Sequence, residues 1–263
     1  MSAIISSEAI EARFAALKAA GRKALVPYVT AGHPDRARSV ALLQGLAGAG
    51  ADVLEVGVPF SDPLADGPVI QASSQAALAA GTTFNTVLEI IAEARVAVPV
   101  VLFSYLNPLL AAGPDALERA AAAGAHGVLV TDLPVGADVA RERWLGEGPL
   151  AFIRLVAPTT PAARMREIST HGSGFVYLIS RLGVTGVRNE LASDLPETVA
   201  RLRAVTSLPI CVGFGIAGPE QAAAVARLAD GVVVGSAIVR QAGQSVEHAV
   251  TFTRSLRAAL DSV

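Results

Sequence analysis

The sequence predicts an α/β protein: a single (β/α)8 TIM barrel over residues 1–263, with an extra N-terminal helix and long loops after strands 2 and 6. Short apolar runs alternate with longer Ala-rich segments from one end of the chain to the other. Such strand–helix alternation implies a parallel sheet. Eight strand–helix units in 263 residues are expected to close into a barrel.

The eight apolar runs are the expected strands. Several are unbroken stretches of Val, Leu and Ile, which is typical of strands buried on both faces. The runs are Leu25–Thr30, Asp52–Val58, Val100–Ser104, Gly127–Thr131, Phe152–Val156, Phe175–Ser180, Pro209–Gly213 and Gly231–Gly235.

The segments between these runs are rich in strong helix formers at helical spacing, so we expect helices there. The clearest are Ala37–Ala49, Phe84–Ala97, Asp115–Ala123, Pro196–Val205 and Pro219–Ala226. Before the first strand, an amphipathic helix from about Ser7 to Ala20 would bring Ile10, Phe14 and Leu17 to one face.

Two connections are unusually long for this fold. The first runs from Pro59 to about Thr82 after strand 2, and the second from Arg181 to about Leu195 after strand 6. Both are expected at the C-terminal ends of the strands, where (β/α)8 barrels carry their chemistry. Long loops in that position are typical of lids over an active site.

Composition and charge narrow the class of protein. Hydrophobic residues make up 52% of the chain, which allows a large core, and the net charge of −2 gives no reason to expect nucleic acid or an anionic membrane as partner. A single cysteine, Cys211, permits no intrachain disulfide and suits the cytoplasm, where we expect the protein. The N-terminus does not have the pattern of a secretory signal.

Two acids in and after the second strand are the candidate catalytic residues. Glu55 lies inside an apolar strand, where burial should raise its pKa toward the range useful for proton transfer. The alternative for Glu55 is a strand carboxylate that is paired with a basic residue or points to solvent. Asp66 lies in the following loop; Asp62 could be the working acid instead, although an Asp before Pro63 is more typical of a turn.

Glycine-containing turns after strands 6, 7 and 8 predict a phosphate site. They are GVTG at 183–186, GFG at 213–215 and GS at 235–236. Glycine lets backbone N–H groups come close to phosphate oxygens. Ser236 could add a hydroxyl, and the short helix that it begins would favour an anion at its N-terminus. The alternative is that these glycines only make tight turns.

The residues that are missing argue against several kinds of chemistry. The two lysines, Lys18 and Lys23, both precede the first strand, so neither a Schiff base nor a pyridoxal phosphate linkage is expected. Of the four histidines, only His33 is expected at the active face, and one histidine does not make a metal site. The chemistry that remains after these exclusions is acid–base catalysis by carboxylates on a phosphorylated substrate.

Four aromatic residues come from different strands or strand ends and could converge at the barrel mouth. They are Tyr28, Phe103, Tyr177 and Phe214. Each alone would be ordinary core, but together they could form a slot for a flat apolar substrate. The residues alone leave both interpretations open.

These segments resemble a known family. The stretch LEVGVPFSDPLADGPVIQ, followed in order by YLISRLGVTG, VGFGI and VVVGSAIV, is similar to tryptophan synthase alpha subunits, from about Ala24 to Val239. The resemblance implies a lyase that splits indole-3-glycerol phosphate by a retro-aldol reaction into indole and glyceraldehyde 3-phosphate. It implies Glu55 and Asp66 as the catalytic pair, with no metal and no cofactor in this chain.

The resemblance also implies substrate-binding residues and a partner. The residues that match the family's binding positions are Tyr28, Phe103, Leu129, Tyr177, Thr185, Gly186, Phe214, Gly215, Gly235 and Ser236. The implied partner is a beta subunit that carries pyridoxal phosphate and consumes the indole within an alpha2beta2 heterotetramer. The implied contact residues are Asp62, Pro63, Asn107 and Pro134.

Three other functions stay open at this point. The first is a stand-alone lyase with the same chemistry but no beta subunit. The second is an inactive subunit that only regulates a partner, against which the intact Glu55 and Asp66 argue. The third is a sugar-phosphate isomerase on the same scaffold, which the aromatic residues and the lack of a metal site disfavour.

Overall fold

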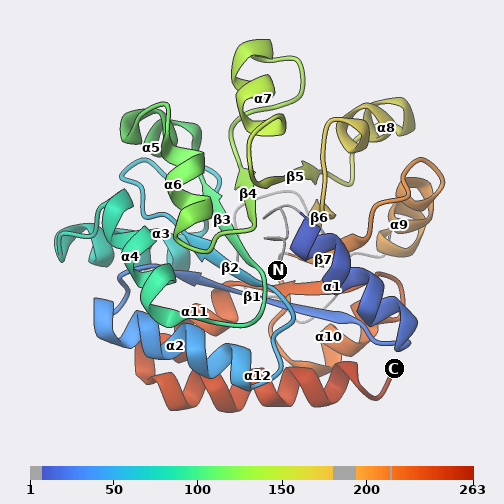
Figure 1. Cartoon of the computed structure of the whole chain (residues 1–263). Coiled ribbons are helices and arrows are strands. Elements are labelled where there is room, and N and C mark those ends of the chain that lie inside the picture. Colours follow the sequence, from blue (N-terminus) through green and yellow to red (C-terminus); the bar gives the residue numbers. More distant parts are fainter. Residues whose placement is uncertain (1–7, 180–193, 214) are drawn as a thin grey trace, which may run out of the picture.

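The computed structural model describes residues 8–179, 194–213 and 215–263. Its strands form a closed parallel barrel in the order β1 to β8, and the helices surround this barrel (Figure 1). The predicted (β/α)8 fold is therefore confirmed. Within the described residues, no helix is long and apolar enough to cross a membrane.

The strands lie close to the positions that the apolar runs predicted. Side chains along them are almost all buried, because the barrel interior covers one face and the helices cover the other. The strands are β1 (Ala24–Thr30), β2 (Leu54–Gly57), β3 (Val100–Ser104), β4 (Gly127–Val130), β5 (Ala151–Val156), β6 (Val176–Ile179), β7 (Ile210–Gly213) and β8 (Gly231–Val234).

The helices include all those that the spacing predicted. They are α1 (Glu8–Ala19), α2 (Arg36–Gly48), α3 (Pro68–Ala79), α4 (Phe84–Ala94), α5 (Leu106–Ala112), α6 (Ala116–Ala122), α7 (Val139–Gly146), α8 (Ala162–Thr170), α9 (Leu195–Arg203), α10 (Pro219–Ala226), α11 (Ser236–Gln244) and α12 (Val246–Leu260).

The connection after β2 is more ordered than the sequence suggested. Helix α3 occupies half of the predicted loop, and residues 58–67, called loop 2 below, connect β2 to this helix without regular structure. Pro68 stands in the first turn of α3 after Gly67 at the N-cap, a common way to begin a helix. The second long connection, after β6, falls at residues 180–193 and lies outside the described residues.

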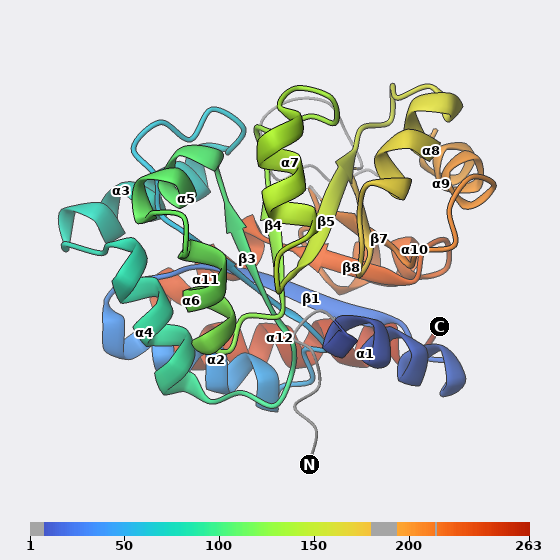
Figure 2. The same cartoon turned by 45° about the horizontal axis from the view of Figure 1, so that its top comes forward.

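The core consists of two apolar clusters, one inside the barrel and one between the barrel and its helices. Helix α1 belongs to the inner cluster, because its predicted apolar face of Ile10, Phe14 and Leu17 packs against the beginnings of the strands (Figure 2). The rings of Phe14 and Phe175 lie 5.6 Å apart. Helix α1 therefore closes the N-terminal end of the barrel and leaves the opposite end for a site.

Candidate active site

Glu55 lies inside the barrel, among apolar and aromatic side chains. It is paired in register with Tyr28 of β1 and Val101 of β3, and only 1% of its surface is exposed. Neither carboxyl oxygen has a hydrogen-bond partner in the described part of the chain. Burial raises the pKa of Glu55 to about 8, because the charged form is poorly solvated there. The alternative of a carboxylate paired with a basic residue is not what these residues show.

Asp66 lies in loop 2 and is also buried, but it has a partner. The hydroxyl of Tyr105 donates a hydrogen bond to Asp66 Oδ2 at 3.1 Å. Burial raises the pKa of Asp66 to about 6, and the Tyr105 hydrogen bond opposes that rise. Asp62, the alternative acid, is exposed on the outer part of the loop. The structure therefore places Asp66, and not Asp62, in the protected position.

Tyr105 is a site residue that the sequence did not indicate. It is the N-cap of α5, one residue beyond the end of β3, and its hydroxyl also accepts a hydrogen bond from the backbone N–H of Ala65 at 2.9 Å. One phenol thus attaches loop 2 to the neighbouring strand and orients Asp66. A tyrosine directly after a strand was the available signal, but the fold of loop 2 was needed to interpret it.

Four of the predicted indole-pocket residues share the inner cluster. Tyr28, Phe103, Leu129 and Tyr177 are all buried there, and the rings of Tyr28 and Phe103 meet edge to face at 5.2 Å. Phe214, the fifth, lies outside the described residues.

Both carboxyl groups act electrostatically on the same two tyrosines. Burial first, then the charges of Asp66 and Glu55, raise the pKa of the Tyr28 hydroxyl. For Tyr177, burial and then the charges of Glu55 and Asp66 are among the causes that raise the pKa. Electrostatic effects of this kind require proximity. Glu55 and Asp66 therefore both lie close to Tyr28 and Tyr177, and this group of side chains is called the aromatic compartment below.

Two strand glycines make room for these tyrosines. A Cβ on Gly57 would lie 2.1 Å from the Tyr28 hydroxyl oxygen, and a Cβ on Gly213 would lie 2.1 Å from that of Tyr177. Any side chain at either position would displace a ring. The glycines at the ends of β2 and β7 thus leave space for the two tyrosine rings, a role that sequence spacing alone could not show.

The predicted phosphate site is described in part. Gly235 is the N-cap of α11, which has no side-chain cap, and Ser236 begins that helix. A Cβ on Gly235 would lie 3.8 Å from Tyr28, so this helix start adjoins the aromatic pocket. Gly215 has φ +80°, a left-handed conformation that favours glycine. Thr185 and Gly186 lie outside the described residues.

Metal ligands are not grouped in the residues that the structure describes: no set of three or more His, Cys, Asp or Glu side chains could hold an ion. Cys211 is buried in the inner cluster. The chemistry that these residues offer is a partnerless carboxyl group and a hydrogen-bonded one beside aromatic rings. A closed (β/α)8 barrel with two buried acids of different pKa beside aromatic rings indicates an enzyme of the acid–base class.

Comparison with known proteins gives the family. Residues 14–261 match the family described as tryptophan synthase alpha chain. The tryptophan synthase alpha chain of Desulfatibacillum aliphaticivorans is 48% identical over 260 residues, which cover 95% of this chain and 98% of that protein. The alpha chain of Gluconacetobacter diazotrophicus is 49% identical over 247 residues, covering 90% and 88%.

Solved structures agree with this assignment. A chain of Mycobacterium tuberculosis tryptophan synthase superposes with a TM-score of 0.88 at 36% identity, covering 95% of this chain and 97% of that one. Tryptophan synthase subunit alpha of Legionella pneumophila gives 0.88 at 36% identity, covering 99% and 100%. The chain belongs to the tryptophan synthase alpha chain family. It is thus a lyase of tryptophan biosynthesis that cleaves indole-3-glycerol phosphate.

Proposed function

We propose that Glu55 and Asp66 carry out this cleavage by acid–base catalysis. Glu55 in its protonated form gives a proton to C3 of the indole ring, which turns C3 into a leaving group. Its carboxylate then takes the proton of the glycerol hydroxyl as the C–C bond breaks. Indole and glyceraldehyde 3-phosphate leave, and Glu55 regains its proton. Asp66 accepts a hydrogen bond from the ring N–H and stabilises the positive charge that develops there.

The observation that supports this proposal best is the contrast between two acids in one aromatic compartment. With a pKa of about 8, Glu55 is protonated at neutral pH and ready to donate. Asp66, with a pKa of about 6 and a Tyr105 partner, is mostly ionised at the same pH. Environments that separate the pKa values of two carboxyl groups are how enzymes assign the roles of acid and base.

The same proposal gives the remaining residues binding roles. The indole ring would lie in the aromatic compartment, and the phosphate at the glycine turns and the start of α11, where free backbone N–H groups favour an anion. The proposed indole contacts are Tyr28, Phe103, Leu129, Tyr177 and Phe214, and the proposed phosphate side comprises Thr185, Gly186, Gly215, Gly235 and Ser236. Binding energy from the phosphate would orient the reacting bond.

Membership of the family implies a beta subunit as partner, and we propose that it docks beside the mouth of the barrel. Three large hydrophobic side chains are exposed on the segments that follow successive strands: Leu64 after β2, Leu110 after β3 and Val139 after β4, at 79%, 39% and 72%. Exposed apolar side chains gathered on one part of a surface mark interaction sites. The proposed contact residues Asp62, Pro63, Asn107 and Pro134 belong to these same segments.

In this proposal, an alpha2beta2 heterotetramer forms in the cytoplasm, pyridoxal phosphate is held only by the beta subunit, and this chain needs no cofactor. The test is release of indole from indole-3-glycerol phosphate by the purified chain, with and without a beta subunit. We expect slow release alone and faster release in the complex. Fast release that a beta subunit leaves unchanged would favour the stand-alone lyase, and no release under either condition would contradict the proposal.

A further inference from the structure

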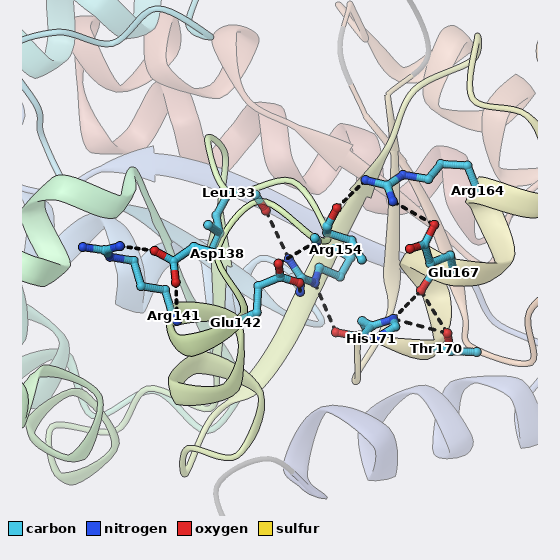
Figure 3. A network of polar contacts seen from close by, with 11 residues as sticks. Leu133, Asp138, Arg141, Glu142, Arg154, Arg164, Glu167, Thr170 and His171 are labelled. Carbon is cyan, nitrogen blue, oxygen red and sulfur yellow. Dashed lines mark hydrogen bonds and ion pairs between the residues drawn. The ribbon is translucent and has the colours of Figure 1, made fainter.

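A buried arginine lies under the connection between β4 and α7. Arg154 of β5 is 5% exposed, and its guanidinium group stacks on the ring of Phe152 at 3.8 Å. Its Nη1 donates to the backbone carbonyl of Leu133 at 3.1 Å, and its Nη2 donates to Glu142 at 2.8 Å (Figure 3). The third nitrogen, Nε, donates to the carbonyl of His171. All three nitrogens are therefore used within the protein, which argues against a ligand site here.

Two further charged side chains hold the same connection, residues 131–138, called loop 4 below. Glu142 of α7 accepts a hydrogen bond from the backbone N–H of Gly136 at 2.6 Å, while its other oxygen binds Arg154. Arg164 of α8 donates to the backbone carbonyl of Val135 and forms an ion pair with Glu167 (Figure 3). Loop 4 is thus attached at three nearby backbone positions to three different elements of the barrel.

The buried ion pair between Arg154 and Glu142 does not by itself indicate a role in stability. A buried ion pair can often be replaced by apolar side chains without loss of stability, and such pairs are best explained where they select one geometry. The three attachments enclose Pro134, which is exposed, and lie just before the exposed Val139. What they determine is the shape of the surface that loop 4 presents to the outside.

We propose that Arg154, Glu142 and Arg164 are positioning residues that hold loop 4 in the shape to which the beta subunit binds. The inference rests on the proposed docking surface and adds the residues beneath it that give the surface its geometry. If loop 4 is already ordered before docking, binding does not have to supply the ordering entropy. Loosening the attachments should then weaken the binding of the beta subunit and leave the chemistry of the assembled complex intact.

The test is a titration of indole release with the beta subunit. The variants are Arg164→Met, whose side chain is partly exposed, and Arg154→Lys, which keeps the buried charge but loses the planar group. We expect the concentration of beta subunit at half-maximal activation to rise about tenfold for each, because each loses a charge-assisted hydrogen bond to loop 4. The rate at saturating beta subunit should stay close to that of the unchanged chain.

Two controls separate positioning from stability. Arg143→Met removes an exposed ion pair with Glu147 on the same helix α7 and should leave the midpoint unchanged. Glu142→Gln keeps an oxygen that can accept from Gly136 and should shift the midpoint less than Glu142→Ala. Thermal melts of each variant show whether the fold is intact.

The outcomes distinguish the inference from the function on which it rests. Unchanged midpoints in both arginine variants, with normal activation, would overturn the positioning role of the three residues. The beta subunit would still be the partner. A lowered rate at saturation with an unmoved midpoint would overturn it as well. If the unchanged chain is not activated by any concentration of beta subunit, the proposed partner itself fails.

Discussion

Two buried acids only three positions apart, Asp52 and Glu55, have opposite surroundings. Both are 1% exposed. Asp52 precedes β2 at the closed end of the barrel and accepts from Arg13 at 2.5 Å, from Arg257 at 2.9 Å and from the N–H of Leu25 at 2.8 Å. Glu55 is inside β2, and neither of its oxygens has a partner in the described residues.

The difference shows what burial does to an acid. Asp52 connects α1, β1 and α12, so its charge is compensated and contributes to holding the chain together. Among the described residues, no group compensates a charge on Glu55, so it keeps its proton to about pH 8. Burial alone therefore does not identify a catalytic acid; burial without a partner, beside other groups of the site, is the more specific sign.

The largest effect should come from removing the proton of Glu55. We expect Glu55→Gln to lower indole release by at least ~10²–10⁴-fold, the usual contribution of a general acid–base group. The fold should survive, because an amide replaces an uncharged carboxyl of nearly the same shape. Steady-state rates and thermal melts measure the two effects. Turnover like that of the unchanged chain would remove Glu55 from the mechanism.

Asp52→Asn is the matched change at the other acid, and it should affect stability instead of chemistry. Arg13 and the buried Arg257 lose the charge of Asp52, although Arg257 keeps its ion pair with Asp261. Breaking a buried ion pair typically costs about 3–5 kcal/mol. Urea unfolding measures this loss, and the rate per folded molecule should remain close to normal. If Asp52→Asn lost activity without losing stability, the contrast between the two acids would be wrong.

The third prediction concerns stability as a function of pH. Burial raises the pKa of Glu55 in the folded chain to about 8, from the ordinary glutamate value of 4.5. Between these values the folded chain binds a proton that the unfolded chain has released. The contribution of Glu55 is therefore fully present below about pH 4.5 and is lost as pH rises toward 8, by about 1.4 kcal/mol per pH unit.

The Glu55→Gln variant lacks this titrating group. The free energy of unfolding of the variant, relative to that of the unchanged chain, should therefore increase as pH rises from 5 to 8. Urea unfolding of both chains at several pH values measures the difference, in which the other titrating groups cancel. A difference that does not change with pH would show that Glu55 is ionised in the folded protein.

The two acids also differ in how much of their surroundings could be predicted from the sequence. A strand that is buried on both faces has a continuous run of apolar residues, which can be recognised locally in the sequence. The run around Glu55 therefore predicted the strand, and it also showed that a carboxyl group is unusual at this position. The pairing of Asp52 could not be predicted, since Arg257 is 205 positions away and only barrel closure brings it near. The same holds for Tyr105, whose role depends on how loop 2 folds back onto the end of β3. Helix α3 was missed although Pro68 marked its start.

The smallest predicted effect concerns Asp66, which is intermediate between the two acids because it has one hydrogen-bond partner. Tyr105→Phe removes that bond and leaves the N–H of Ala65 without its acceptor. A lost hydrogen bond to a charged group costs about 1.5–3 kcal/mol, so we expect indole release to fall about tenfold to a hundredfold.

The pH dependence of Tyr105→Phe makes this prediction specific. Activity should fall as pH rises through about 8, where Glu55 loses its proton, and as pH drops through about 6, where Asp66 gains one. Because the Tyr105 hydrogen bond lowers the pKa of Asp66, the variant should move only the acidic limb, and toward higher pH. The basic limb, which reports the partnerless Glu55, should stay in place. A shift of both limbs together would mean that the two carboxyl groups titrate as one coupled pair, and that the distinction between an acid with a partner and one without does not hold at this site.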